Sequence, residues 1–531
     1  MIVDFNHCED STQFDADVCI VGGGMAGLTI ARSLLGSGLR VLLVESGGLA
    51  RDARVEALNR VESEGPQTLD LVSTRPRLVG GSTSAWGSFL TPLDASDFVA
   101  RPSVPLSGWP FTIDALEPYY RRAHAVFGLG PARFDAQLWP LFGAAPHAFD
   151  PERLHVKFWQ LSSPSLFPLV SPQRFGSLYR AELAKADALR VLINASVASI
   201  ATTEARSHVT QLALRSLDGR GARVTARAFV LAAGAIENAR LLLISELGGN
   251  QVGRCFMDHP HTRLGIALPK DPLGFLETWA VRRRRGKVAL QPALCPTPKF
   301  QAEQDILNAS VSFEIDRHPE CPTLAFAEIA SALRARQRPP QFARKLGRIA
   351  RDPGVFAANA WRRLAHGSGV IPRVKALVLY GRSEQEPNPD SRVTLERERD
   401  ALDMPRARVA WRLTERDRRT NVAMAQLLTA EFSRLDIGTV VPSEWLAGKH
   451  GWPDALRGGP HHSGTTRMAD DARLGVVDRD GRLHGVDNLY AAGPSVFPTN
   501  GYANPALTTV ALALRLADHL SGRDGNCGNS P

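Results

Sequence analysis

Cysteine is scarce and scattered in this chain. Six cysteines occur among 531 residues, at wide and irregular spacings. There is no CxxC pair, no CxxCH haem-attachment site and no cluster with the spacing of zinc ligands. We therefore expect no metal and no haem held by the chain itself. Cys19 lies inside an apolar strand pattern, so a buried free thiol is expected there.

Long apolar runs and a secretion signal are also missing. No segment approaches the roughly 20 consecutive apolar residues that a membrane-spanning helix needs. The first fifteen residues are polar and acidic, without a basic start or an apolar run. We therefore expect a cytoplasmic protein. We also expect two packed domains, because 531 residues are too many for a single simple core.

Lysine is rare, and arginine supplies nearly all of the positive charge. Only eight of the 63 Lys and Arg residues are lysines, and the formal net charge is +9. The arginines are scattered apart from one run at 282–285, and no zinc-finger spacing or RNA-binding aromatic signature accompanies them. This pattern indicates a basic surface, and we expect no nucleic-acid partner.

Residues 16–46 have the pattern of a strand, a glycine turn, a helix closed by Gly38 and a second strand. Gly22, Gly24 and Gly27 form GxGxxG, which allows a tight turn, close approach of a pyrophosphate and close helix packing. Glu45 follows Gly27 by 18 residues and ends the second strand. An acid there suits the diol of a ribose and repels a 2′-phosphate.

Two later segments favour FAD over a nicotinamide cofactor. AFVLAAGAIENARLLL (228–243) ends a strand and begins a helix, and VDNLYAAGPSVFPT (486–499) ends another strand at a glycine. Each would bring backbone past the nucleotide again, which a plain nicotinamide dehydrogenase does not need. Residues 262–454 differ in character, with many prolines, and an apolar helix, ALTTVALALRLADHL, closes the chain.

Four stretches resemble the glucose–methanol–choline (GMC) oxidoreductase family over nearly the whole chain. They are the glycine turn at 17–46, RPRLVGGSTSAWGSFLTPLDASDF (75–98), EQEPNPDSRVTL (384–395) and the long segment 461–508, from HHSGTTRM to GYANPALT. The motifs are most similar to the pyranose-oxidase branch and related bacterial sugar dehydrogenases. The resemblance implies an α/β (α+β) fold in which a Rossmann-type FAD-binding domain is interleaved with a sheet-backed substrate-binding domain.

The resemblance also implies domain limits and an activity. We expect the FAD-binding domain at 15–100, 190–261 and 455–531, and the substrate-binding domain at 101–189 and 262–454. The expected reaction oxidises a CH–OH group of a sugar, glycoside or polyol by hydride transfer to flavin N5, with oxygen, a quinone or a redox protein as electron acceptor. A redox-neutral lyase or decarboxylase and a flavin electron-relay subunit are the alternatives.

The residues expected to contact FAD lie in the glycine turns, at the strand ends and at the start of the last helix. They are Gly22, Gly24, Met25, Ala26, Gly27, Glu45, Ser46, Arg77, Gly80, Gly81, Ser82, Ser84, Trp86, Gly87, Val197, Ala233, Gly234, Gly493, Asn504 and Pro505.

The resemblance makes His461 the catalytic base and Asn504 its partner. Histidine suits proton removal near neutral pH, and an amide can hold the same hydroxyl without adding charge. The adjacent His462 leaves a one-residue ambiguity, although a supporting position is expected for it. Asn504 before Pro505 also fits a helix N-cap, which alone would explain the asparagine.

The sequence MDHPH contains Asp258, His259 and His261. A metal site is one interpretation of these residues. We favour a polar loop beside the flavin domain.

Retention of the flavin is expected to be non-covalent. In the pyranose-oxidase branch, the block after the double glycine often carries a histidine bonded to the flavin. Ala85 occupies that position here, and residues 75–98 contain no histidine or cysteine.

Residues 325–366 combine arginines with Leu, Ile, Phe and Trp at near-helical spacing. We expect a helical insertion over the substrate-binding domain. A solvated basic cap is the favoured interpretation, and a contact with an acceptor protein or an anionic membrane is the alternative.

Overall fold

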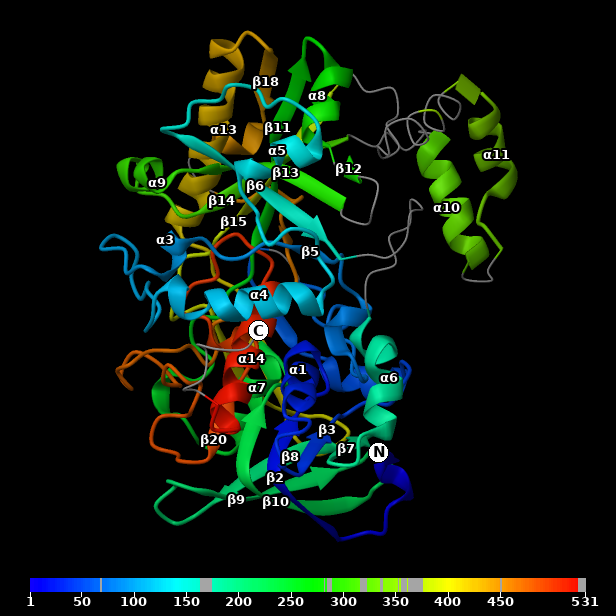
Figure 1. Cartoon of the computed structure of the whole chain (residues 1–531), viewed down its shortest axis with the longest axis vertical. Coiled ribbons are helices and arrows are strands. Elements are labelled where there is room, and N and C mark those ends of the chain that lie inside the picture. Colours follow the sequence, from blue (N-terminus) through cyan, green and yellow to red (C-terminus); the bar gives the residue numbers. More distant parts are fainter. Residues whose placement is uncertain are drawn as a thin grey trace.

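Two large sheets lie one above the other along the long axis of the molecule (Figure 1). The structure is a computed structural model that describes the chain apart from residues 67–68, 163–173, 281, 284–288, 316–321, 335–337, 352, 355–360, 362–375, 449–450 and 524–531. The arrangement confirms the expected α/β fold.

The first sheet is mainly parallel and has the strand order β1-β7-β3-β2-β10-β9-β8, with β20 also paired to β10. Only the β8–β9 and β9–β10 pairs are antiparallel. The strands are β1 (Ile2–Asp4), β2 (Thr12–Val21), β3 (Val41–Val44), β7 (Leu189–Ile193), β8 (Ser196–Thr202), β9 (Val209–Arg215), β10 (Gly221–Leu231) and β20 (Leu489–Ala491).

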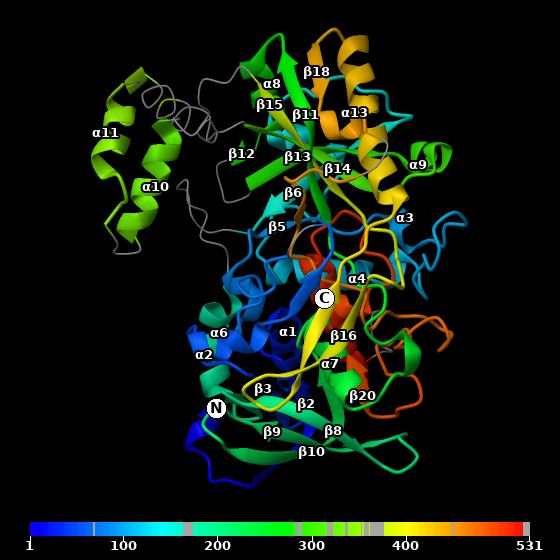
Figure 2. The ribbon, with the colours of Figure 1, turned by 180° about the vertical axis from the view of Figure 1, so that it is seen from behind.

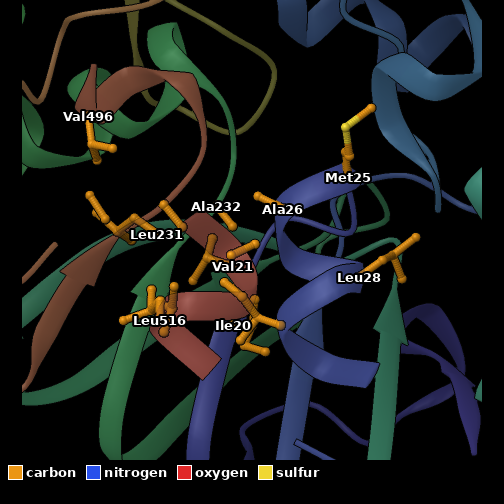
Figure 3. Packing of buried hydrophobic residues seen from close by; sticks show 14 of the residues in the cluster. Ile20, Val21, Met25, Ala26, Leu28, Leu231, Ala232, Val496 and Leu516 are labelled. Carbon is orange, nitrogen blue, oxygen red and sulfur yellow. The ribbon is translucent and has the colours of Figure 1, made fainter. Parts of the chain in front are cut away.

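Helices cover this sheet, so its central strands are apolar throughout. All four residues of β3 are buried, as are the last four of β2, as expected for parallel strands buried on both faces. Figure 3 shows Ile20 of β2, Leu231 of β10 and Leu516 of the last helix packed together. That helix, α14 (Ala506–Leu520), has the limits that the sequence predicts.

Two elements differ from the sequence pattern. Helix α1 (Met25–Ser33) ends before Gly38, because the chain turns at Gly36, where φ is +77°. The apolar run RVLINASVASI (190–200) has the pattern of one strand but is divided between β7 and β8, because Asn194 has φ +60° and donates a hydrogen bond to Asp4 across the sheet edge.

The second sheet is antiparallel and has the order β18-β11-β15-β14-β13-β6-β5, with β12 paired to β13 and β19 to β11. Its strands are β5 (Phe89–Leu90), β6 (Leu154–Leu161), β11 (Pro260–Pro269), β12 (Arg282–Arg283), β13 (Ala289–Pro296), β14 (Ala309–Ile315), β15 (Leu377–Ser383), β18 (Gly438–Pro442) and β19 (Arg457–Gly458). Trp279 of α8 (Pro272–Trp279) and Phe432 of α13 (Glu415–Arg434) pack against Phe313 in the core beside it.

A small third sheet contains β16 (Arg392–Arg399), β17 (Pro405–Ala410) and β4 (Glu62–Glu64). The remaining helices of four or more residues near the two large sheets are α2 (Ala53–Glu56), α3 (Ala95–Phe98), α4 (Glu117–Val126), α5 (Trp139–Phe142), α6 (Phe175–Lys185), α7 (Ala235–Ile244) and α9 (Pro298–Gln304). Tyr120 of α4 is hydrogen-bonded to Thr508 of α14 at 2.9 Å, so α4 is attached to the first sheet's helical layer.

Helices α10 (Pro322–Arg334) and α11 (Phe342–Ala350) stand to one side of the second sheet (Figures 1 and 2). They are the main described part of the expected insertion at 325–366, much of which lies outside the described residues. Of the helices that the structure describes, none is long and apolar enough to span a membrane.

Candidate functional site

The three glycines of the GxGxxG motif meet three different steric demands. Gly22 has φ +106°, and a Cβ atom there would lie 2.7 Å from the Ala232 carbonyl oxygen. A Cβ on Gly27 would lie 1.9 Å from the Gly22 carbonyl oxygen, so the helix packs against the turn at closest range. A Cβ on Gly24 would meet nothing within 4 Å. The open backbone at Gly24 suits a pyrophosphate at the helix N-terminus.

Glu45 follows β3 at the same edge of the sheet, and its carboxylate is buried. One oxygen accepts a hydrogen bond from the Gly23 amide at 2.7 Å, and the other accepts from the Gly47 amide at 2.8 Å. The carboxylate is thereby fixed beside the glycine turn, as a ribose ligand requires.

The second glycine block is attached directly to the first. The Gly80 amide donates to the Gly23 carbonyl at 2.7 Å, and a Cβ on Gly81 would lie 2.9 Å from the Gly24 Cα atom. Ser84 donates to the Gly81 carbonyl at 2.9 Å. Trp86 is partly buried, with its ring centroid 5.6 Å from that of Phe127. Ser82 and Gly87, by contrast, are exposed.

A cavity lies beside the glycine turn and is lined by residues from several separate stretches of the chain. Five of the residues expected at FAD line it: Gly22, Ser46, Arg77, Val197 and Ala233. Asp400, Leu402 and Met404 in the turn between β16 and β17 also line it, which the sequence did not indicate. Its position beside the glycine turn suits the nucleotide end of FAD.

Three arginines surround Glu237 at this cavity. The guanidinium groups of Arg77, Arg240 and Arg75 lie 3.0, 3.3 and 3.5 Å from its carboxylate. Burial alone would raise the pKa of Glu237, but the three cations outweigh it and hold the pKa at about 2. Asp400 pairs with Arg240 at 2.6 Å. One net positive charge is left among these five groups, which favours an anionic ligand.

Two other glycine-containing strand ends converge on α1. Ala232 donates to the Val21 carbonyl and Ala492 to the Leu231 carbonyl, both at 2.8 Å, so β2, β10 and β20 end side by side. A Cβ on Gly493 would lie 3.8 Å from the Cβ of Ala26 at the start of α1. A Cβ on Gly234 would meet nothing within 4 Å. Met25 and Ala26 mark the start of α1 in Figure 3, and a Cβ on Gly24 just before it would also meet nothing within 4 Å.

His461 is in contact with a second histidine. Its Nδ1 atom is 2.8 Å from Nδ1 of His259, and the ring centroids are 4.9 Å apart. His259 comes directly before β11, whereas His461 follows β19, so the pairing of β11 with β19 brings the two rings together.

The surroundings of His259 fix which nitrogen carries the proton in each ring. Nε2 of His259 faces the carbonyl oxygens of Gly501 at 2.9 Å and Asn500 at 3.3 Å, which can only accept a hydrogen bond. Burial lowers the pKa of His259 to about 4, so the ring is neutral near pH 7. With its proton on Nε2, His259 must accept at Nδ1, and His461 must donate from Nδ1. The lone pair of His461 is therefore on Nε2, where a base needs it.

A third histidine completes the cluster. His261 is hydrogen-bonded to Tyr380 through Nδ1 at 3.3 Å, and its ring centroid is 5.9 Å from that of His461. A Cβ on Gly459 would lie 2.6 Å from Nδ1 of His461 and 2.9 Å from Nε2 of His261, so a glycine is required between the two rings. Burial and then the two neighbouring histidines lower the pKa of His461 well below its usual range.

Asp258 anchors the backbone beneath this cluster. One carboxylate oxygen accepts from the amides of His259 at 2.7 Å, His461 at 2.8 Å and Gly459 at 3.1 Å. Burial raises the pKa of Asp258 to about 7 despite these donors. Ligand atoms of Asp258, His259 and His461 lie within 4.8 Å of one another, close enough to hold a metal. The two histidine nitrogens are already joined by a hydrogen bond, so the cluster is explained without an ion.

The MDHPH segment is only in part the polar loop that we expected, because Asp258 and His259 precede β11 whereas His261 lies within it. His259 is only 1% exposed and contacts the expected base directly. The alternation of histidines at 259 and 261 along the start of one strand was the available signal, since such residues point to the same side.

The side chain of His462 points away from the cluster, because neighbouring side chains point to different sides of the chain. Its ring stacks on Phe256, and its Nε2 atom is 3.8 Å from the second oxygen of Asp258. Of the two histidines of the HH pair, His461 is the one that is hydrogen-bonded to His259.

The expectation that Asn504 caps the last helix was wrong. Pro505 is the N-cap of α14, and the first helical hydrogen bond runs from the Thr509 amide to the Pro505 carbonyl at 2.7 Å. The Asn504 side chain turns away and donates to the Phe89 carbonyl of β5 at 3.1 Å. The amide keeps one N–H and its oxygen for another ligand. No described hydrogen bond joins Asn504 to His461; Gly501 links their segments through His259.

Two family models match the chain. The model described as "FAD dependent oxidoreductase" matches residues 17–252, and the model described as "GMC oxidoreductase" matches residues 387–513. The first range contains the glycine turns and Glu45, and the second contains His461 and Asn504.

Curated relatives align over nearly the full length. The fructose dehydrogenase large subunit of Gluconobacter japonicus is 23% identical over 95% of this chain and 97% of its own length. The 6'''-hydroxyparomomycin C oxidase of Streptomyces lividus is 26% identical over 95% of this chain and 92% of its own length. A C-glycoside 3-oxidase of Arthrobacter globiformis is 36% identical, over 22% of this chain and 21% of its own length.

Solved structures share the fold over almost every residue. A formate oxidase superposes with a TM-score of 0.55 at 17% identity, covering 97% of this chain and 99% of the other. A fungal aryl-alcohol oxidase superposes with a TM-score of 0.56 at 16% identity, with the same coverage.

Proposed function

Because the chain belongs to the GMC family of FAD-dependent oxidoreductases, we propose that it oxidises a CH–OH group of a sugar, glycoside or polyol to a carbonyl. The aligned relatives whose names state a substrate include a fructose dehydrogenase, paromamine-type oxidases and C-glycoside oxidases. Those names support a sugar-type alcohol.

The residues around the glycine turn fit the cofactor. Gly24 and the N-terminus of α1 would hold the pyrophosphate, Glu45 the ribose diol, and the cavity at Val197 and Ala233 the adenine end. When bound, FAD supplies the acceptor for the hydride.

The hydrogen bond between His461 and His259 is the observation that carries the proposed chemistry, because it assigns the tautomer of His461. His259 accepts the Nδ1 proton of His461, so Nε2 of His461 can take the proton of a substrate hydroxyl. The same Nδ1–H···N contact holds the ring after proton uptake, because the imidazolium still donates to His259. Histidine is a base of suitable strength for this step.

Asn504 would hold the same hydroxyl from its own segment. Its amide already spends one N–H on Phe89, which fixes its plane. The second N–H can donate to the substrate oxygen as the hydroxyl proton moves to His461. An amide adds no charge that would compete for that proton.

We infer that FAD is held without a covalent bond. Ala85 has no nucleophile, and residues 75–98 contain no histidine or cysteine. Acid precipitation of the holoenzyme is expected to release all of the yellow colour into the supernatant. Flavin that stays in the pellet would contradict this inference.

Anaerobic titration of the holoenzyme with a panel of sugars, glycosides and polyols tests the proposed function. Hydride transfer from substrate is expected to bleach the visible flavin absorbance in stoichiometric amounts. A substrate that is consumed without bleaching would indicate a redox-neutral reaction. No bleaching by any alcohol would favour an electron-relay subunit.

A further inference from the structure

The helices α10 and α11 form a hairpin that stands beside the body of the molecule in both views (Figures 1 and 2). Lys345 of α11 pairs with Glu328 of α10 at 2.8 Å, and Ala325 and Ile329 of α10 are buried. The two helices therefore have an inner side that packs and an outer side that faces away from it.

The hairpin, and Trp361 after it, expose large apolar side chains. Phe326 and Leu333 of α10, Phe342 and Leu346 of α11, and Trp361 are exposed by 42–69%. Among the residues that the structure describes, every exposed aromatic side chain lies in this segment: Phe326, Phe342 and Trp361. A cluster of exposed aromatic and leucine side chains indicates a binding surface rather than a solvated cap.

Charge and apolar residues are separated on α11. Phe342, Leu346 and Ile349 are spaced i, i+4, i+7 and share one face. Arg344, Arg348 and Arg351 have the same spacing and share the opposite face. Residues 322–351 contain seven Lys and Arg residues and a single acidic residue, Glu328.

We propose that this hairpin docks on the surface of an anionic lipid bilayer. Phe342 and Leu346 would enter the boundary between headgroups and acyl chains, and the arginines on the opposite face would lie among the anionic headgroups. A helix with a basic face and a Phe/Leu face binds a membrane interface by both contributions. None of the described helices can span a bilayer, so the contact is interfacial. The proposal does not depend on the chemistry of the His461 site.

Sedimentation of the holoenzyme with vesicles tests the proposal. Vesicles of phosphatidylcholine mixed with phosphatidylglycerol are expected to bind the enzyme, and vesicles of phosphatidylcholine alone to bind it much more weakly. Binding should weaken as salt is raised. The double variant Phe342→Glu, Leu346→Glu should bind the anionic vesicles about a hundredfold more weakly.

Leu474→Glu is the matched control, because Leu474 is 48% exposed, close to the 44% of Leu346, and lies on another part of the chain. It should bind the anionic vesicles as the parent does. Flavin content and the thermal midpoint report whether the double variant is folded. If the double variant is not folded, Arg344→Gln, Arg348→Gln serves as a second variant. Its binding to anionic vesicles should depend less steeply on salt.

Three outcomes would overturn the proposal. One is equal binding of the parent to neutral and anionic vesicles, or none to either. Another is an equal loss in Leu474→Glu. The third is self-association that the double variant abolishes while vesicle binding is absent, which would assign the surface to a second copy of this chain.

Discussion

The glycine turn and the histidine cluster are built in contrasting ways. The turn is local: Gly22 to Gly27 form one continuous segment, and Glu45 joins it from the next strand of the same sheet. The cluster is assembled from 258–261, 459–462 and 500–504, and its geometry depends on the pairing of β11 with β19. The turn acts through backbone groups, and a substitution changes a side chain without removing these groups. The cluster acts through side chains whose contributions can be measured one at a time.

Gly27→Ala is the variant for which we expect the largest effect. Its Cβ would lie 1.9 Å from the Gly22 carbonyl oxygen. Because both groups belong to the backbone, neither can move aside as a flexible side chain can. We expect loss of bound FAD and destabilisation by at least about 1–3 kcal/mol. The flavin-to-protein ratio and thermal unfolding measure both effects.

Gly347→Ala is the control for Gly27→Ala. Gly347 lies within α11, and a Cβ there would meet nothing within 4 Å. Normal FAD content and a small gain of up to about 1 kcal/mol are expected. A normal FAD content in Gly27→Ala would show that the turn tolerates a side chain.

His461→Ala should slow flavin reduction by about 10²–10⁴-fold, the usual contribution of a positioned general base. FAD content should stay normal, because His461 lies outside the glycine turns. Stopped-flow measurement under anaerobic conditions gives the rate. His462→Asn is the neighbouring control, and a loss below about tenfold is expected because this ring faces Asp258 and Phe256. If His462→Asn proved the more damaging, the two roles would have to be exchanged.

The local motif could be predicted from sequence, and the remote cluster only in part. The β2–α1–β3 unit and the limits of α14 follow from apolar runs and glycines that are adjacent in the chain. His461 was found through family resemblance. His259 was missed because its role depends on a contact across 202 residues of sequence. Asn504 was assigned a capping role because Asn-Pro is a local signal, whereas its partner, Phe89, lies 415 residues away.

Two variants of His259 separate its two hydrogen bonds. His259→Gln places an amide near the Nε2 position and keeps a donor to Gly501, but removes the acceptor for His461. His259→Asn places its amide oxygen near the Nδ1 position and keeps that acceptor. We expect His259→Gln to reduce flavin more slowly than His259→Asn by about tenfold, the worth of one hydrogen bond of about 1.4 kcal/mol. Equal rates would mean that His259 acts only as a packing residue.

The smallest expected effect is the pH dependence of flavin reduction. The pKa of His461 is lowered by burial and by the neighbouring histidines, so the ring stays neutral, and basic, until the pH falls through that lowered value. A base with the ordinary histidine pKa of about 6.5 would lose about fourfold in rate between pH 8 and pH 6. We expect nearly constant rates over that interval at saturating substrate.

Among the groups that face the cluster, burial lowers the pKa of His259, His261 and His462 and keeps these rings neutral over this interval, so Asp258, with a pKa raised to about 7, is the group that can titrate there. An acid limb near pH 7 that disappears in Asp258→Asn would belong to this carboxylate. The same limb persisting in Asp258→Asn would show that His461 titrates near its ordinary pKa and that its burial does not shift it.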